Sequence, residues 1–173
     1  MAAELIRVEG LREIAIAARK LTDEVKRKIA FDGLTAGARL VRNAARGLAP
    51  VLKRPDPRRR PGTLRNAIVA ARVRRGDFPE EVKVIVGVRF LSKRAVAKFK
   101  AGNPGKSGAE NPNDPFYADM VELGTKAHRK RGKGTPRVQY LKRGFEPNAS
   151  AAANKIRDIS RRGILRYGNS LAK

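Results

Sequence analysis

Side chains capable of acid–base or nucleophilic chemistry are few in this chain, and they do not form a catalytic set. The sequence has no cysteine and one histidine, His128, which excludes thiolate nucleophiles, disulfides and histidine-cluster metal sites. The adjacent carboxylates Glu80 and Glu81 fall in an expected turn, where a solubilising role is favoured. The segment GNPGKSG at 102–108 contains Gly-Lys-Ser but lacks the first glycine of a phosphate-binding loop. We therefore expect no enzyme activity, no metal and no cofactor.

Glu122 is the carboxylate with the most distinctive sequence context. It falls in a short amphipathic segment, 117–123, that Gly-Thr follows at 124–125, and the cations Lys126 and Arg129 come soon afterwards. A single acid among so many bases is expected to be paired, either within the chain or across a subunit boundary. The alternative is an ordinary surface ion pair, which contributes about 0–1 kcal/mol.

Positive charge dominates the composition. The chain has 40 Lys and Arg against 16 Asp and Glu, a formal net charge of +24, which favours binding to a polyanion. Two basic clusters are candidate phosphate contacts, namely Arg58, Arg59 and Arg60 in a proline-rich loop, and Lys126, Arg129, Lys130, Arg131 and Lys133. We expect the arginine triplet to stay out of the core, because burying three unpaired guanidiniums is costly. The expected strands carry no aromatic side chains for base stacking, so any nucleic-acid contact should involve phosphates and lack sequence preference.

Helical periodicity predicts three of the elements that position these residues. Apolar residues at helical spacing predict a helix over 11–21, a long helix over about 23–48 and a C-terminal helix over about 149–167. Thr22 is the expected N-cap of the long helix, and Pro50 ends it. Its predicted buried face is Ala30, Leu34, Ala38, Val41, Ala45 and Leu48. Its polar stripe, either solvated or facing a partner, is Thr35, Arg39, Arg42 and Arg46.

Alternating valines predict the β-structure. The segments 69–75 and 82–88 follow a period of two, and the turn residues between them indicate an antiparallel hairpin. The predicted fold is therefore α+β, a small antiparallel sheet packed against the long helix and the C-terminal helix. Turn-forming residues at 102–115 predict a long loop insertion over about 90–116, in which LSKRAVAKFK at 91–100 is compatible with one or two helical turns.

Two shorter helical segments are expected near the C-terminal end. One is 117–123, ended by Gly124, and the other starts at Pro136. We expect Pro147 to break or kink the second, and Asn148 to cap the helix that follows. The whole chain, 1–173, is predicted to be one domain. It has no apolar run long enough for a membrane span and no signal-peptide pattern at its start, so we expect it to stay where it is made.

Several sequence segments, taken in order, resemble the tail-component family of long-tailed bacteriophages, whose members are tail-completion, head–tail joining or minor tail proteins. These segments are RVEGLREI at 7–14, the alanine-rich helix ending at 49–50, GTLRNAI at 62–68, YADMVELGT at 117–125 and PRVQYLKRGFE at 136–146. The insertion at 90–116 is longer than is usual in that family. The family's apolar Pro-Phe step is replaced by Pro136-Arg137-Val138.

The resemblance implies a structural virion protein of the phage neck or upper tail, without enzyme activity. Such a protein forms a homo-oligomeric ring, for example a hexamer, around the DNA channel. Its implied partners are other copies of itself, the tail terminator, tail tube and connector, and genomic DNA bound without sequence specificity; no membrane is involved. It would be assembled in the host cytoplasm and located in the virion. The implied subunit or partner interface is Tyr117, Val121, Glu122, Gly124, Thr125, Tyr140 and Leu141.

Two other function classes stay open from the sequence. One is a non-sequence-specific nucleic-acid-binding protein, such as a DNA- or RNA-coating factor, whose affinity should fall steeply as the salt concentration rises. The other is a small enzyme acting on nucleic acid, which the absence of acid clusters and the single histidine disfavour.

Overall fold

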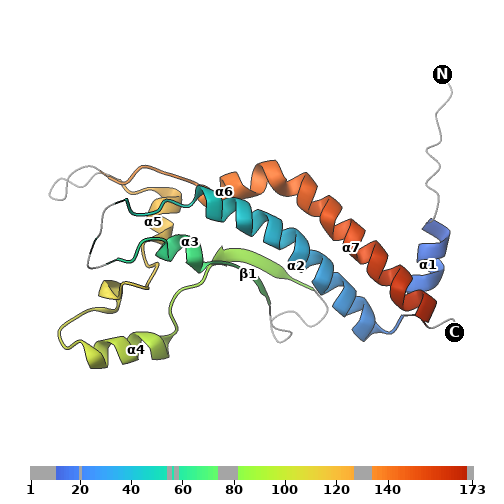
Figure 1. Cartoon of the computed structure of the whole chain (residues 1–173), viewed down its shortest axis with the longest axis horizontal. Coiled ribbons are helices and arrows are strands. Elements are labelled where there is room, and N and C mark those ends of the chain that lie inside the picture. Colours follow the sequence, from blue (N-terminus) through green and yellow to red (C-terminus); the bar gives the residue numbers. More distant parts are fainter. Residues whose placement is uncertain are drawn as a thin grey trace, which may run out of the picture.

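The computed structural model describes residues 11–19, 21–53, 56, 59–73, 82–126 and 134–170. Two long helices lie side by side with a two-stranded sheet against one of them (Figure 1), which confirms the predicted α+β fold. The elements are α1 (Leu11–Arg19), α2 (Asp23–Leu48), α3 (Thr63–Ala67), β1 (Ile68–Arg72), β2 (Val84–Val88), α4 (Lys93–Gly102), the 3₁₀ turn η1 (Gly108–Glu110), α5 (Ala118–Leu123), α6 (Tyr140–Phe145), the 3₁₀ turn η2 (Glu146–Asn148) and α7 (Ala149–Ser170). No helix within these ranges has the length and apolarity to cross a bilayer.

The predicted ends of α2 are confirmed. The Thr22 hydroxyl oxygen accepts a hydrogen bond from the Val25 N–H at 3.5 Å, and two acids occupy the first turn, where the helix dipole favours them. At the other end the Ala49 N–H donates to the Ala45 carbonyl at 2.9 Å, directly before Pro50. Local capping and a proline therefore determine the length of the central helix.

The buried face of α2 differs from the predicted one. The buried residues are Ile29, Gly33, Gly37, Val41 and Ala45, so the predicted Val41 and Ala45 are correct. Ala30, Leu34 and Ala38 are only half-buried, and Leu48 is exposed. The buried face of α2 is rotated about the helix axis relative to the predicted face, because α7 packs directly on the two glycines. A Cβ atom on Gly37 would be 2.6 Å from Cγ1 of Ile156, and one on Gly33 would be 2.6 Å from the Ser160 hydroxyl oxygen.

The sheet is the predicted antiparallel pair, with shorter strands. Ile68 pairs with Val88 and Arg72 with Val84, so the side chains of Arg72 and Val84 lie on the same face of the sheet. That face lies on α2, because Arg72 donates to Asp32 at 2.9 Å. Ile85 lies on the other face and is 58% exposed. The predicted turn, including Glu80 and Glu81, lies outside the described residues.

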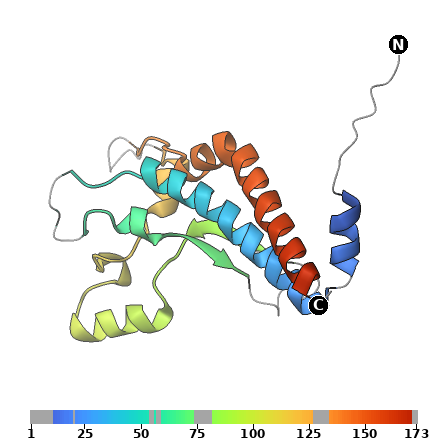
Figure 2. The same ribbon diagram turned by 45° about the vertical axis from the view of Figure 1, so that its right-hand side comes forward.

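The segment 90–116 contains α4 and η1, so the helical turns considered for 91–100 do form within the predicted insertion. Ser92 caps α4, accepting the Ala95 N–H at 3.2 Å, and Ser107 and Glu110 form a capping box at η1. Both views show α4 set apart from the α2–α7 pair (Figures 1 and 2). The turn residues of this region lie around the helix and do not prevent it from forming.

The prediction that Pro136 starts a helix is wrong. Residues 134–139 are not helical, and α6 begins at Tyr140 after Gln139, which has a left-handed φ of 54°. The helical path then continues through η2 into α7, so Pro147 changes one turn to 3₁₀ geometry without breaking the path. The Asn148 side chain donates to the Gly144 carbonyl at 3.0 Å and does not cap α7.

Candidate functional site

Six of the seven predicted interface residues belong to a structural unit that we call the clasp: α5, residues 124–126, residues 134–139 and the first turn of α6. Backbone hydrogen bonds join its two sides. The Val138 N–H donates to the Val121 carbonyl at 3.0 Å, and the Thr125 N–H donates to the Thr135 carbonyl at 3.0 Å. The Thr125 hydroxyl oxygen in turn accepts the Thr135 N–H at 2.8 Å. The segment that was predicted to be a helix is therefore held as an extended strap against α5.

The Glu122 carboxylate caps α6, so it has partners within the chain. One carboxylate oxygen accepts the Leu141 N–H at 3.0 Å, and the other accepts the Lys142 N–H at 3.2 Å. The first N–H groups of a helix have no partner within it, so a carboxylate at this position satisfies two of them and also interacts favourably with the helix dipole. The interface role that the resemblance implies for Glu122 stays a prediction, whereas its capping of α6 is a definite role inside one chain.

Gly124 is required by the geometry of the clasp. Its φ of 74° lies in the left-handed region that favours glycine. A Cβ atom there would lie 3.0 Å from the Thr135 carbonyl oxygen and 3.1 Å from the Arg137 nitrogen. The Gly-Thr pair therefore lets the chain leave α5 while the strap passes close to it.

Tyr140 belongs to the core of the molecule. Its side chain is 1% exposed, and its hydroxyl donates to the Ala118 carbonyl at 3.5 Å. Burial, and secondarily the negative charges of Glu122 and Asp119, raise the pKa of its phenol. Its buried neighbours are Ala45, Ala49, Leu64, Ile68 and Ala118. Of the other predicted interface residues, Tyr117, Val121 and Leu141 are half-buried against this core and Thr125 is exposed.

Arg59 is half-buried and stacks on aromatic rings, a contact that the sequence did not predict. Its guanidinium lies 4.7 Å from the ring centroid of Tyr117 and 5.4 Å from that of Phe116. An arginine can do this because its flat, weakly hydrated group stacks on aromatic rings. Arg60 is exposed, and its backbone N–H donates to the Pro112 carbonyl at 3.2 Å. Lys126 is exposed, whereas Arg58, Arg129, Lys130, Arg131 and Lys133 lie outside the described residues.

This arrangement predicts different effects for two neighbouring arginines. Arg59→Ala should lower the free energy of unfolding by about 1 kcal/mol, because it removes the stacking on two rings. Arg60→Ala, which removes only an exposed side chain, should change it by less than about 0.5 kcal/mol. Urea unfolding of the two variants checks this, and equal midpoints would contradict a structural role for the Arg59 side chain.

The polar stripe of α2 is largely engaged within the chain. The Arg46 guanidinium donates to the Ile68 carbonyl at 2.9 Å and to the Asn66 carbonyl at 3.3 Å. Burial, together with the nearby Arg42 and Arg65, lowers the pKa of Arg46. Arg42 donates to the Asn43 side chain at 2.8 Å, and Arg39 is exposed. Arg46 thus ties α2 to the start of β1, a role that the spacing alone did not predict.

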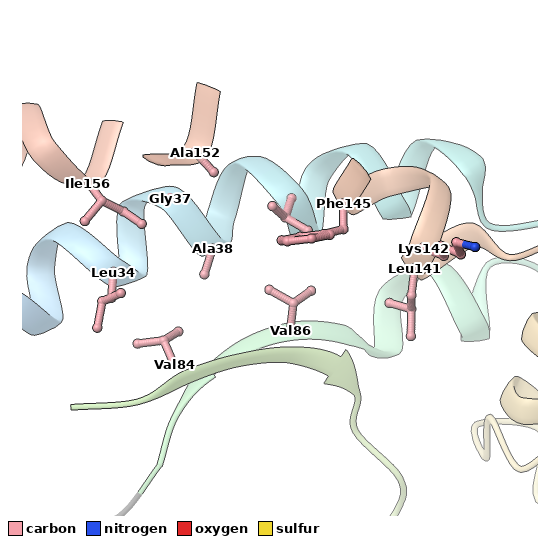
Figure 3. Close-up of a pocket in the computed structure, with 11 residues that line it drawn as sticks. Leu34, Gly37, Ala38, Val84, Val86, Leu141, Lys142, Phe145, Ala152 and Ile156 are labelled. Atoms are coloured by element: carbon pink, nitrogen blue, oxygen red, sulfur yellow. The ribbon is translucent and has the colours of Figure 1, made fainter. Parts of the chain in front are cut away.

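An open apolar groove lies between α2, β2, α6 and α7, with a volume of about 420 Å³. Side chains from all four elements point into it (Figure 3). Its lining is Leu34, Gly37, Ala38, Val41, Val84, Val86, Leu141, Lys142, Phe145, Ala152 and Ile156. Lys142 is the one charged residue in this lining, and Phe145 is 55% exposed. Sequence analysis missed the groove because it arises where half-buried residues of four separate segments meet.

The groove offers apolar contact and no reactive groups. In the part of the chain that the structure describes, no three His, Cys, Asp or Glu side chains are grouped so that they could hold a metal ion. The arrangement suits packing against another surface. Comparisons with family models, curated proteins and solved structures found no match to the chain.

Proposed function

We propose that this chain is a structural virion protein of a phage neck or upper tail, which completes the tail or joins it to the head as a homo-oligomeric ring around the DNA channel. The ordered set of sequence segments described above supports this assignment. No catalytic role is part of the proposal, because the site residues hold the fold together and line an apolar surface.

The groove of Figure 3 is the observation that carries the proposal. A chain of this size normally closes its core, yet here four elements leave an apolar opening with Phe145 at 55% exposure. Further large apolar side chains are exposed elsewhere, including Leu123 at 65% and Ile85 at 58%. Surfaces of this kind are typical of proteins that pack against neighbours. We assign the groove to contact with an adjacent copy of the chain.

Charge explains why such a ring would surround DNA. Subunits with a formal charge of +24 repel one another. A polyanion in the channel offsets that repulsion, and so does a high salt concentration, since the Debye length falls from about 10 Å at 0.1 M to about 3 Å at 1 M. Apolar contacts do not weaken under the same change.

The alternative function, a non-sequence-specific nucleic-acid-binding protein, makes the opposite prediction about salt. The ring proposal expects the purified chain to assemble into a closed oligomer as salt rises toward 1 M without nucleic acid. The alternative expects a monomer at every salt concentration. Sedimentation velocity across this range separates the two, and a monomer throughout would contradict the ring.

A matched pair of variants tests the place of the contact. Phe145→Ser, at the edge of the groove, should reduce assembly at least about tenfold. Phe90→Ser, which removes a phenylalanine of similar exposure (49%) away from the groove, should leave assembly unchanged. Antibody labelling of purified virions provides the test of location: label at the head–tail joint supports the proposed function, and absence of the chain from virions rejects it.

A further inference from the structure

Helix α4 carries the most uniformly basic surface among the described helices. Its ten residues, KRAVAKFKAG, include four cations and no acid. All four cations are exposed, and so are the two alanines among them. These six residues, which we call the cationic face, are Lys93, Arg94, Ala97, Lys98, Lys100 and Ala101. Neither predicted basic cluster includes any of them.

The opposite side of α4 holds it in place. Ala95, Val96 and Phe99 are half-buried, and they share one side of the helix at the 3.6-residue period. Val96 lies directly on η1, since a Cβ atom on Gly108 would be 2.7 Å from Cγ1 of Val96. The apolar side of α4 therefore faces η1, and the cationic face points outward.

The projecting segment is anchored to the body at its base. The Pro112 carbonyl accepts hydrogen bonds from the Arg60 N–H at 3.2 Å and from the Thr63 hydroxyl at 3.0 Å. Asn111 is buried at 8% exposure, and its side chain accepts the Asn113 N–H at 3.0 Å. Figures 1 and 2 show α4 extending away from α2 and α7 from this base. The cationic face therefore lies away from α2 and α7, where a large partner can reach it.

The charges on this face are available to an external anion. Within the described ranges, none of the observed ion pairs involves Lys93, Arg94, Lys98 or Lys100. The nearest acid along the chain, Glu110, uses its carboxylate to accept the Ser107 N–H at 2.7 Å.

The composition of the face favours phosphates over an acidic protein. Three of the four cations are lysines, which bind phosphate groups as point charges. The face has no aromatic or large aliphatic anchor of the kind that dominates protein–protein affinity. The alanines between the cations are small, so they allow a partner with regularly spaced charges to approach the helix closely. Double-stranded DNA carries one charge per about 1.7 Å of axis.

We propose that the cationic face of α4 binds the phosphate backbone of double-stranded DNA without reading its sequence. This inference rests on the proposed function, in which DNA passes through the ring, and it assigns the contact to a surface outside the predicted clusters. Bases are not read, because the face lacks the side chains with paired donors and acceptors that recognise base edges.

The test measures DNA binding of the full chain as a function of salt. The first variant combines Lys93→Gln, Arg94→Gln, Lys98→Gln and Lys100→Gln, changes that keep good helix formers. Its control combines Lys155→Gln, Arg157→Gln, Arg161→Gln and Arg166→Gln, which removes the same charge from exposed positions on α7. Fluorescence anisotropy with a random-sequence DNA duplex gives the dissociation constant at each salt concentration.

The expected result follows from counterion release, which contributes a slope of about 0.9 per phosphate contact. For the α4 variant, the slope of log binding constant against log salt concentration should become shallower by about 3 to 4. Its binding near 0.15 M salt should be at least about tenfold weaker. The α7 variant should lose less than about 1 from the slope. Equal losses in the two variants would overturn the proposal, as would a wild-type chain that does not bind the duplex. Either result leaves the ring to be judged on its own assembly and location.

Two further measurements identify the partner directly. Because the chain has no cysteine, Ala97→Cys can carry a photo-crosslinker within the cationic face, and Ala153→Cys carries it on an exposed part of α7. Crosslinking to DNA should be several-fold greater from position 97, and equal yields would contradict the proposal. An α4 variant that keeps DNA binding but loses binding to polyglutamate would show that an acidic protein is the partner, which overturns the assignment to DNA.

Discussion

Replacing Gly144 with alanine should lower the free energy of unfolding by about 3 kcal/mol, the upper end of the usual overpacking cost. Gly144 is buried where α6 crosses α2, and a Cβ atom there would lie 2.7 Å from the backbone nitrogen of Ala45 and 2.8 Å from its Cα. These are backbone atoms in the last turn of α2, so they cannot move aside as a flexible side chain would. The two helices would have to separate, which would also disturb the packing of Tyr140.

Gly47→Ala provides the matched control on the other helix of the same crossing. A Cβ atom on Gly47 would meet nothing within 4 Å, and alanine is favoured over glycine within a helix by up to about 1 kcal/mol. This variant should therefore be unchanged or slightly more stable. Urea unfolding followed by circular dichroism measures both. A Gly144→Ala midpoint equal to that of the wild type would mean that α6 does not lie as close to α2 as described.

Local signals were sufficient to predict much of the fold. Thr22 and Pro50 bound α2 because capping and the missing N–H of proline act within a few residues. The alternating valines at 84, 86 and 88 predicted β2 because alternate residues of a strand share one face. The α+β class follows from these local patterns, since a helix and a hairpin with apolar faces must cover each other.

Tertiary contacts decided what the sequence could not predict. Hydrophobic periodicity ranks Leu34 above Gly33, yet Gly33 is the buried residue because the missing side chain allows α7 to approach. Hydrophobic periodicity counts apolar side chains, so it does not detect a helix contact that forms because glycine has no side chain. The same limit applies at Pro136, where the strap pairs with α5 and this pairing overrides the local helical pattern.

In the candidate site, too, local sequence signals did not indicate the tertiary contacts. The family resemblance implied a subunit interface that includes Glu122 and Tyr140, and the structure shows that both side chains also have partners inside the chain. The acceptors and donors involved are backbone groups, which every residue carries and no sequence pattern distinguishes. The stacking of Arg59 was not predicted because its aromatic partners, Phe116 and Tyr117, lie far away in the sequence.

Glu122→Ala should lower the free energy of unfolding by about 2 kcal/mol. The change leaves the Leu141 and Lys142 N–H groups without their acceptors, and hydrogen bonds to a charged group contribute about 1.5–3 kcal/mol. Glu122→Gln keeps one oxygen acceptor and should cost about half as much. Glu146→Ala is the control, because it removes an acid whose exposed ion pair with Lys142 spans 3.6 Å and contributes little.

Stability and assembly measured on the same Glu122 variant separate its two interpretations. If the carboxylate acts as the cap of α6, urea unfolding of the monomer changes first, and any loss of ring formation at high salt follows from a displaced α6. Its Phe145 side chain forms part of the groove, so the cap is also a support for the proposed contact surface. A Glu122→Ala monomer that unfolds at the wild-type midpoint but no longer assembles would instead place the carboxylate at the boundary between subunits. The intrachain bonds to α6 would then contribute little to stability.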